Sequence, residues 1–167
     1  FVDNGDGTVT DTSTGLMWDQ CYAGFSGHGS CTTNTGEKKF FYRDEALELA
    51  ATQNAANYKA YSDWRVPSIV ELQTLVKGTT APTIDTAAFP ASTPEAVCSA
   101  SINVHALFER WCVYFTVGLV GPSDIFTKVR LVRGGHSSGT FGLLFGGVSG
   151  TTTTTTTLSA TSPVGTT

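Results

Sequence analysis

Four cysteines are the feature that most limits what this chain can fold into. They stand at Cys21, Cys31, Cys98 and Cys112, an even set without a C-x-x-C pair or a histidine at metal-ligand spacing. Two disulfides are therefore favoured over a zinc site, and disulfides persist in oxidising compartments. Closeness in sequence predicts the pairs Cys21–Cys31 and Cys98–Cys112, each closing a short loop. Four buried free thiols in a cytosolic protein are the alternative.

Low charge is the second constraint on the fold. Charged residues make up 14% of the 167 residues, against about 25% in an average domain. Glycine and threonine are abundant, which favours one β-rich, loop-rich domain over a helical bundle. The net charge of -4 leaves no basic face for nucleic acid. No apolar run approaches the roughly 18 residues of a membrane helix, so we expect neither nucleic-acid binding nor membrane insertion.

The charge distribution divides the chain at residue 135. Residues 136–167 contain no Asp, Glu, Lys or Arg, and they include the apolar stretch Thr140–Phe145 and the seven threonines Thr151–Thr157. We therefore expect a globular domain over residues 1–135 and a Gly/Thr-rich extension after it. The chain begins with Phe1 rather than methionine, for which removal of an export signal is one expected cause.

The extension is an aggregation hazard if it stays exposed, because it is uncharged and rich in β-prone residues. Two interpretations stay open: its threonines carry O-linked sugars, or it adds as a strand to a sheet of its own or a neighbouring subunit. The candidate assembly residues are Phe141, Leu143, Leu144, Phe145, Thr151, Thr153, Thr155 and Thr157. The candidates for O-glycosylation are Thr152, Thr154 and Thr156.

The first third of the chain combines short strands with one helix. Turns rich in Asp, Asn and Gly separate strand-like stretches within residues 1–20. A Gly/Ser/Thr loop follows over residues 22–37, where a solvated His28 is expected. A helix is predicted from Asp44 to about Ala56. Its stripe is Leu47, Ala50, Ala51 and Asn54.

A capping box marks a second helix, in which Ser68 caps an exposed amide and Glu71 reaches back to the Ser68 amide. Gly78 is placed to end this helix. Its apolar face is Ile69, Leu72, Leu75 and Val76.

The segment after this helix is expected to be irregular before the chain returns to strands. Residues 79–101 are rich in Pro, Ala and Thr and show no periodicity, which predicts a loop. Strand patterns over residues 111–120 and 125–132, joined by residues 121–124, predict a hairpin at the centre of a sheet.

Acidic and amide side chains near the N-terminus form a candidate calcium site. Asp3, Asn4 and Asp6 supply oxygens at closely spaced positions, as calcium loops do. The EF-hand pattern fails, however, because Val2 and Ser13 fall where its first and twelfth ligands belong. Turn chemistry is the alternative, and no other cofactor is expected.

Five spaced motifs carry a family resemblance. They are Phe1–Asp11, Thr14–Trp18, Tyr61–Pro67 with Glu71-Leu72, Ile84-Asp85 with Phe89-Pro90, and Val129–Gly135. In this order they resemble the Lcl C-terminal domain family, a bacterial family of largely unknown function named for a collagen-like adhesin. The resemblance implies a C-type-lectin-like α+β fold, with two helices packed on short twisted antiparallel sheets and long irregular loops, here followed by the β-prone extension. It also implies export and, for some members, adhesion to glycans or surfaces.

Enzymatic chemistry finds little support in the sequence. His28, His105 and His136 lie in dissimilar segments, and no G-x-S-x-G motif accompanies them. A calcium-dependent lectin also lacks its signature, because the triplets Glu-Pro-Asn, Gln-Pro-Asp and Trp-Asn-Asp of that fold are absent.

Aromatic and charged residues inside the motifs are expected to be structural. Trp18, Trp64 and Trp111 could stack on sugars, but Trp18 and Trp64 are expected in the core. Asp63 and Arg65 flank Trp64 and are expected to pair with each other.

These observations predict a non-enzymatic protein of the cell surface or extracellular space, a self-assembling filament-like subunit whose extension docks on a neighbouring copy. Its expected partners are copies of itself, in a homopolymer, with glycans as the second class. The alternative is a glycan-binding adhesin that works without calcium. Assembly should depend on the extension and survive a chelator, whereas adhesion should depend on residues 1–135 and be competed by sugar.

Overall fold

A computed structural model describes residues 1–36, 39–93, 95–106, 108–125 and 127–135 of the chain, and we call residues 1–135 the head. The candidate assembly residues from Phe141 to Thr157 and the candidate glycosylation residues Thr152, Thr154 and Thr156 lie outside the described residues.

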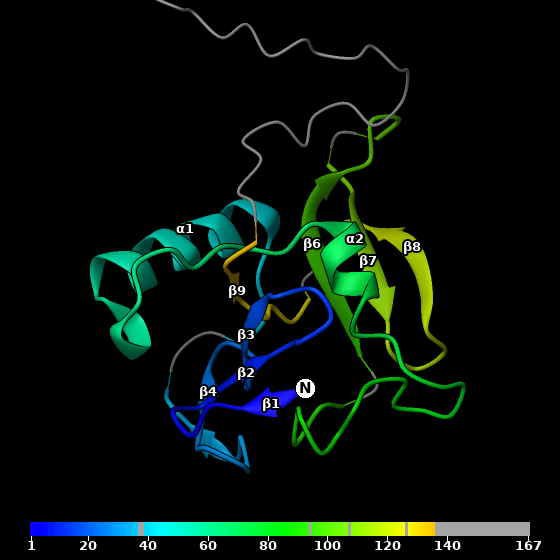
Figure 1. Ribbon diagram of the computed structural model, residues 1–167. Helices are drawn as coiled ribbons and strands as arrows, with labels where there is room; N and C mark the ends of the chain where they lie inside the picture. Colours follow the sequence, from blue (N-terminus) through cyan, green and yellow to red (C-terminus); the bar gives the residue numbers. More distant parts are fainter. Residues whose placement is uncertain (37–38, 94, 107, 126, 136–167) are drawn as a thin grey trace, which may run out of the picture. The chain divides into compact units, whose positions relative to one another are not determined.

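Short helices and strands make up the head (Figure 1). The helical elements are α1 (Arg43–Ala55), the 3-10 turn η1 (Tyr58–Ala60) and α2 (Ile69–Gln73). The strands are β1 (Val2–Asp3), β2 (Thr8–Thr10), β3 (Met17–Asp19), β4 (Phe25–Ser26), β5 (Thr33–Asn34), β6 (Ala96–Ile102), β7 (Arg110–Tyr114), β8 (Leu119–Ser123) and β9 (Val132–Arg133). The expected α+β fold, with two α-helices and short antiparallel sheets among the described residues, is confirmed; its C-type-lectin-like character stays a prediction.

One sheet joins the two ends of the head. Its four strands lie in the order β1-β2-β3-β9 and pair antiparallel, with Val9 opposite Trp18 and Trp18 opposite Val132. All three side chains are fully buried. The expected strands within residues 1–20 are confirmed, and β9 completes their sheet from the far end of the head.

A second sheet has the order β6-β7-β8, again antiparallel, and α2 packs against β6 and β7 (Figure 1). Cys98 lies opposite Cys112, and the two form a disulfide across β6 and β7. The loop after Tyr22 holds a third, two-stranded sheet of β4 and β5. A second disulfide joins Cys21 to Cys31 at this loop, so both expected pairs are confirmed.

The buried apolar side chains form two clusters. The larger one, between the first two sheets and α2, consists of Val9, Leu16, Trp18, Tyr22, Leu72, Leu75, Ile84, Phe89, Val97, Val113, Phe115 and Val132. The smaller one, beneath α1, consists of Phe41, Ala46, Ala50, Trp64, Val66, Val129 and Leu131. Trp18 and Trp64 are therefore core residues, as expected, whereas Trp111 is partly exposed.

Both helices form where the sequence predicted them, with corrections. The buried side chains of α1 are Ala46 and Ala50, whereas Leu47 is exposed, so the expected stripe is rotated around the helix. The amide of Asn54 sets this rotation, because it accepts a hydrogen bond from Trp64 N (2.7 Å) and donates one to Trp64 O (2.8 Å). This clamp ties the helix to a core tryptophan that lies ten residues away.

The capping box of α2 is confirmed. Ser68 Oγ accepts a hydrogen bond from Glu71 N, and Ser68 N donates one to Glu71 Oε2 (2.8 Å). The helix ends at Gln73 rather than near Gly78, because Val76 forms a β-bridge with Ile84. Leu72 and Leu75 are buried, and Ile69 and Val76 pack against the larger core cluster.

The predicted hairpin is wrong in position. Residues 96–102 form β6 instead of a loop, and residues 111–120 are broken by a turn at Phe115–Gly118, so that β7 pairs with β8. The positive φ of Gly118 (71°) allows this turn, and the Cys98–Cys112 disulfide secures the strand that the Pro- and Thr-rich composition concealed.

Candidate docking surface and pocket

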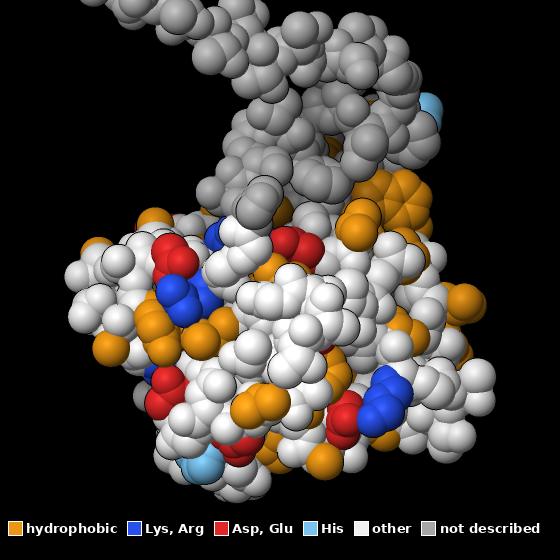
Figure 2. Space-filling model, in the orientation of Figure 1, with side chains coloured by type: hydrophobic (Ala, Val, Ile, Leu, Met, Phe, Trp, Pro, Cys, Tyr) orange, Lys and Arg blue, Asp and Glu red, His pale blue; other side chains and the backbone are white. Residues whose placement is uncertain are grey.

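Exposed apolar side chains gather at one end of the β6-β7-β8 sheet. Ile102 is paired with Arg110, which is paired with Ser123, so the end of β6, the start of β7 and the end of β8 lie side by side. The exposed apolar residues here are Ile102 (37%), Val104 (69%), Phe108 (93%) and Ile125 (63%). We call these four residues the sheet-end cluster. Figure 2 shows hydrophobic side chains gathered near the upper end of this sheet.

The connection between β6 and β7 holds Phe108 outward. Asn103 N donates to Glu109 O (3.0 Å), and Asn103 Nδ2 donates to Glu109 Oε2 (2.8 Å). Two further backbone hydrogen bonds run from Ala106 N to Asn103 O (3.1 Å) and from Glu109 N to Ala106 O (2.8 Å). These four hydrogen bonds hold the shape of the loop, and the Phe108 ring is exposed to solvent.

A buried cation anchors the same end of the sheet to the rest of the head. Arg110 is 3% exposed, and its Nη2 donates to Phe41 O (2.6 Å) and to Thr127 Oγ1 (3.2 Å). Burial lowers the pKa of the Arg110 guanidinium below its usual range. These hydrogen bonds fix the start of β7, next to the exposed cluster, to the segments that contain Phe41 and Thr127.

The strand β8 is a poor acceptor for an added strand. Pro122 carries no N–H, and its carbonyl accepts a hydrogen bond from the Tyr114 hydroxyl (3.1 Å). The Tyr114 ring lies against Gly121, where a Cβ would stand 3.1 Å from Tyr114 Cε2. Tyr114 and Pro122 together therefore hinder the pairing of another strand with this part of β8.

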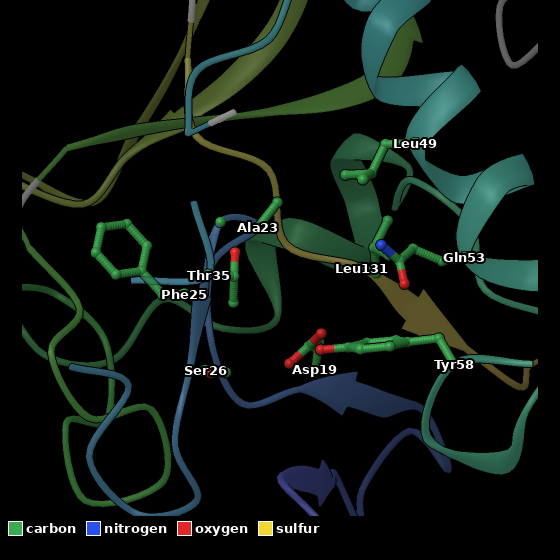
Figure 3. A pocket seen from close by; sticks show the side chains of 10 residues that line it. Asp19, Ala23, Phe25, Ser26, Thr35, Leu49, Gln53, Tyr58 and Leu131 are labelled. Atoms are coloured by element: carbon green, nitrogen blue, oxygen red, sulfur yellow. The ribbon is translucent and has the colours of Figure 1, made fainter. Parts of the chain in front are cut away.

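A pocket of about 160 Å³ opens between α1, η1 and the loop after β3 (Figure 3). It is lined by Asp19, Ala23, Gly24, Phe25, Ser26, Thr35, Leu49, Gln53, Tyr58 and Leu131. Figure 3 shows the hydroxyl end of Tyr58 directed toward the carboxylate of Asp19, with the Gln53 amide close to the ring. The volume is below the roughly 300–1,000 Å³ of typical ligand pockets, so only a small group fits.

The polar groups of the pocket differ in their bonding. Asp19 Oδ1 accepts hydrogen bonds from Lys59 Nζ (2.9 Å) and Cys21 N (3.0 Å). No residue in the described part of the chain hydrogen-bonds the side chains of Gln53 or Ser26. The pocket therefore offers an amide, a hydroxyl and an aromatic ring to a ligand, whereas its carboxylate already has an internal cation.

The motif order and this architecture agree with a comparison against known families. The pattern of the Lcl C-terminal domain matches residues 7–133. The chain belongs to this family. No curated protein matches the chain. The matched residues contain β2 through β9, and both disulfides lie inside them.

The candidate calcium residues of this Lcl C-terminal domain are engaged in turns. Asp3 Oδ1 accepts a hydrogen bond from Gly5 N (2.9 Å), and Asp6 Oδ1 accepts from Thr8 N (2.9 Å) and Thr8 Oγ1 (2.6 Å). Asn4 Nδ2 donates to the hydroxyl of Thr8 (2.9 Å). Within the described ranges, no group of three or more His, Cys, Asp or Glu side chains is placed to hold a metal ion.

His28 is not simply solvated. Its Nε2 lies 2.9 Å from Asp3 Oδ1, linking the loop of the first disulfide to β1. The Gly5 backbone hydrogen bond and then His28 hold the pKa of Asp3 below its usual value. The imidazole is nevertheless exposed, as the sequence predicted, and the turn at Asp3 adds an acceptor that lies 25 residues away in the chain.

The expected Asp63–Arg65 ion pair is also wrong. Arg65 forms a two-pronged pair with Glu71 (2.6 and 2.7 Å), and Asp63 accepts from Arg133 Nε (2.6 Å). The two charges flank a buried tryptophan, and each binds a different segment of the Lcl fold. The Asp63–Arg133 pair links two distant motifs, whereas Arg65 and Glu71 lie six residues apart within one motif. Both pairs join parts of the fold, which supports their structural interpretation.

Sequence analysis missed the sheet-end cluster. The segment around Phe108 lay between a predicted loop and a predicted strand, and no periodicity marked it. The usable signal was Asn103 six residues before Glu109, a polar pair that closes a loop around apolar residues.

Proposed function

We propose that this Lcl C-terminal domain is a non-enzymatic extracellular structural subunit, which assembles when the extension of one copy docks on the head of the next. The sheet-end cluster is the observation that carries the proposal, because exposed apolar groups gathered at one place mark interaction sites. The uncharged extension supplies a matching apolar segment in the same chain.

Two further observations support the proposal. Both disulfides are formed, which is compatible with an extracellular protein. No helix in the described part of the head is long and apolar enough to cross a membrane. A head-to-tail contact that does not close on itself generates filaments, so one donor segment and one acceptor surface are sufficient.

The test compares the full chain with a full-length variant in which Phe141, Leu143, Leu144 and Phe145 are replaced by serine. Electron microscopy and light scattering should find filaments or large oligomers for the unmodified chain and monomers for the variant. A second variant, with Thr151–Thr157 changed to serine, separates the apolar stretch from the threonine run. An unmodified chain that stays monomeric over a wide concentration range would refute the proposal.

A glycan-binding adhesin is the second candidate function, favoured by the pocket beside Tyr58. Sugar sites combine an aromatic ring with amide and hydroxyl groups, which Tyr58, Gln53 and Ser26 provide. Binding to a panel of immobilised oligosaccharides should weaken in Gln53→Ala and survive a chelator. The control is Gln73→Ala, at an exposed position on α2. Equal binding by both variants, or no binding by the unmodified chain, would remove this candidate.

A further inference from the structure

We infer that the sheet-end cluster, with Phe108 as its anchor, is the acceptor for the segment Phe141–Phe145 of a second copy of this chain. The inference rests on the proposed function and names the surface that assembly would use. Nothing in the family match assigns a role to these residues.

Phe108 differs from Phe1, Leu47 and Val70, three other exposed apolar residues of the head. Phe1 is partly covered, because its ring packs edge-to-face with Phe89, with centroids 5.1 Å apart. Leu47 and Val70 stand on different helices, on their exposed faces. Phe108 is almost fully exposed, has three apolar neighbours at the same sheet end, and stands on a loop that several internal hydrogen bonds hold. Aromatic side chains of this kind act as anchors at protein interfaces.

Charge disfavours an acidic occupant. The carboxylates of Glu109 and Asp124 flank the cluster in sequence. The neighbouring cation Arg110 is buried and donates its hydrogen bonds to Phe41 and Thr127. An acidic partner would therefore be repelled here. The segment Phe141–Phe145 holds two phenylalanines and two leucines without any charge, so docking buries no ion.

The guarded β8 edge indicates how the segment docks. Added strands bind through backbone hydrogen bonds, and Pro122 together with the Tyr114 hydroxyl removes two of the backbone groups that β8 would use. The segment therefore binds mainly by burying side chains against Ile102, Phe108 and their neighbours. The interface should then resist salt and depend on a few apolar side chains.

The decisive experiment uses two full-length variants, each of which should fail to assemble for a different reason. Phe108→Ser keeps the donor segment and loses the acceptor anchor. The serine variant of Phe141, Leu143, Leu144 and Phe145 keeps the acceptor and loses the donor. Val70→Ser, an exposed apolar position on α2, is the matched control for the first variant. Far-ultraviolet circular dichroism and the two disulfides, counted by mass, verify that each variant folds.

We expect Phe108→Ser to raise the concentration needed for assembly by about tenfold or more, as the loss of an interface anchor does. Val70→Ser should assemble like the unmodified chain. When the donor-deficient and Phe108→Ser variants are mixed, the intact donor of one meets the intact acceptor of the other. Sedimentation velocity should then detect a 1:1 heterodimer that neither variant forms alone.

The outcomes separate the inference from the proposed function. Assembly of Phe108→Ser at the unmodified concentration, while the donor-deficient variant stays monomeric, would overturn the acceptor assignment and leave the proposed function standing. Absence of the heterodimer from the mixture would overturn it equally. Monomers in the unmodified chain would refute both.

Discussion

The two large sheets of the head are fastened in different ways. In the β1-β2-β3-β9 sheet, the turns are closed by polar side chains such as Asp6, which bonds Thr8, and Asp11, which bonds Ser13. In the β6-β7-β8 sheet, a disulfide joins the edge strand β6 to the central strand β7, and apolar side chains such as Phe108 and Leu119 are left exposed. The polar groups at the turns of the first sheet are bonded within the sheet, whereas the second sheet exposes apolar side chains that another molecule can cover.

Because of this difference, we expect the β1-β2-β3-β9 sheet (the polar half) and the β6-β7-β8 sheet to unfold under different conditions. The hydrogen bonds of the first sheet depend on the protonation of carboxylates and on a buried arginine. The Cys98–Cys112 disulfide of the second sheet depends on the redox state of its two cysteines.

Replacing Arg130 should be the most damaging single change to the polar half. Its guanidinium is fully buried between the rings of Tyr22 (4.3 Å) and Phe89 (4.6 Å), and burial lowers its pKa. Its hydrogen-bond acceptors are the carbonyls of Asp19 and Gln20 and the hydroxyl of Ser92. Arg130→Met leaves these acceptors unpaired, and we expect a loss of about 3–5 kcal/mol in the free energy of unfolding, measured with urea.

Arg133→Met is the matched control for Arg130→Met. Arg133 pairs with Asp63 near the surface, so its loss should cost about 1 kcal/mol or less. Equal costs for the two variants would show that the buried arginine does not hold the four-stranded sheet.

Removing the disulfide of the second sheet should have the next largest effect. The double variant Cys98→Ala/Cys112→Ala opens a loop of 14 residues, for which we expect a loss of about 3 kcal/mol. Hydrogen exchange should quicken in β6 and β7 and change little in β2 and β3. The paired variant Cys21→Ala/Cys31→Ala should leave exchange in β6 and β7 unchanged, and a uniform increase in both sheets would contradict the separation.

Acid should weaken the contacts of two carboxylates, Glu71 on α2 and Asp11 after β2. Burial works to raise the pKa of Glu71, but hydrogen bonds from Arg65 and Ser68 outweigh it and hold the pKa below its usual value. Burial also works to raise the pKa of Asp11, but hydrogen bonds from Ser13 and Thr14 outweigh it and hold that pKa below its usual value. A pKa that is lower in the folded state stabilises the protein above the unfolded pKa, about 4 for carboxylates, and this stability is lost as pH falls through the folded value.

We therefore expect urea midpoints to fall between about pH 4.5 and pH 2. Glu71→Gln should lose about 1–2 kcal/mol at pH 7 and show a flatter decline with acid. Asp44→Asn, at a carboxylate whose side chain is 88% exposed, is the control and should match the unmodified chain. A Glu71→Gln profile parallel to that of the control would refute the role of the Arg65–Glu71 pair.

The smallest expected effect on stability belongs to Phe108→Ser. Because the ring is exposed, its loss should change the free energy of unfolding by no more than about 0.5 kcal/mol in dilute, unassembled protein. The Val113→Ser variant, in the fully buried centre of β7, is the contrast and should lose several-fold more. A large loss for Phe108→Ser would place this residue in the fold rather than on a docking surface.

Particular residues show how far sequence reasoning reached. The capping box at Ser68 and Glu71 and both cysteine pairs are local patterns, and all three formed as predicted. The pairing of Asp63 and Arg65 failed because each side chain found a partner on another segment. Strand β6 was missed because its pairing with β7, rather than its own Ala- and Ser-rich composition, makes it a strand.

The sequence by itself determined the turns, caps and disulfide pairs, whose partners lie no more than 14 residues apart, and it also determined the division of charge at residue 135. Tertiary structure decided which strand joins which sheet, where each ion pairs, and that Phe108 stands exposed beside Ile102 and Ile125. The physical reason is how far apart in the chain the interacting groups lie. Caps and turns are closed by neighbours along the chain, whereas a surface cluster and a buried cation depend on segments that only packing brings together.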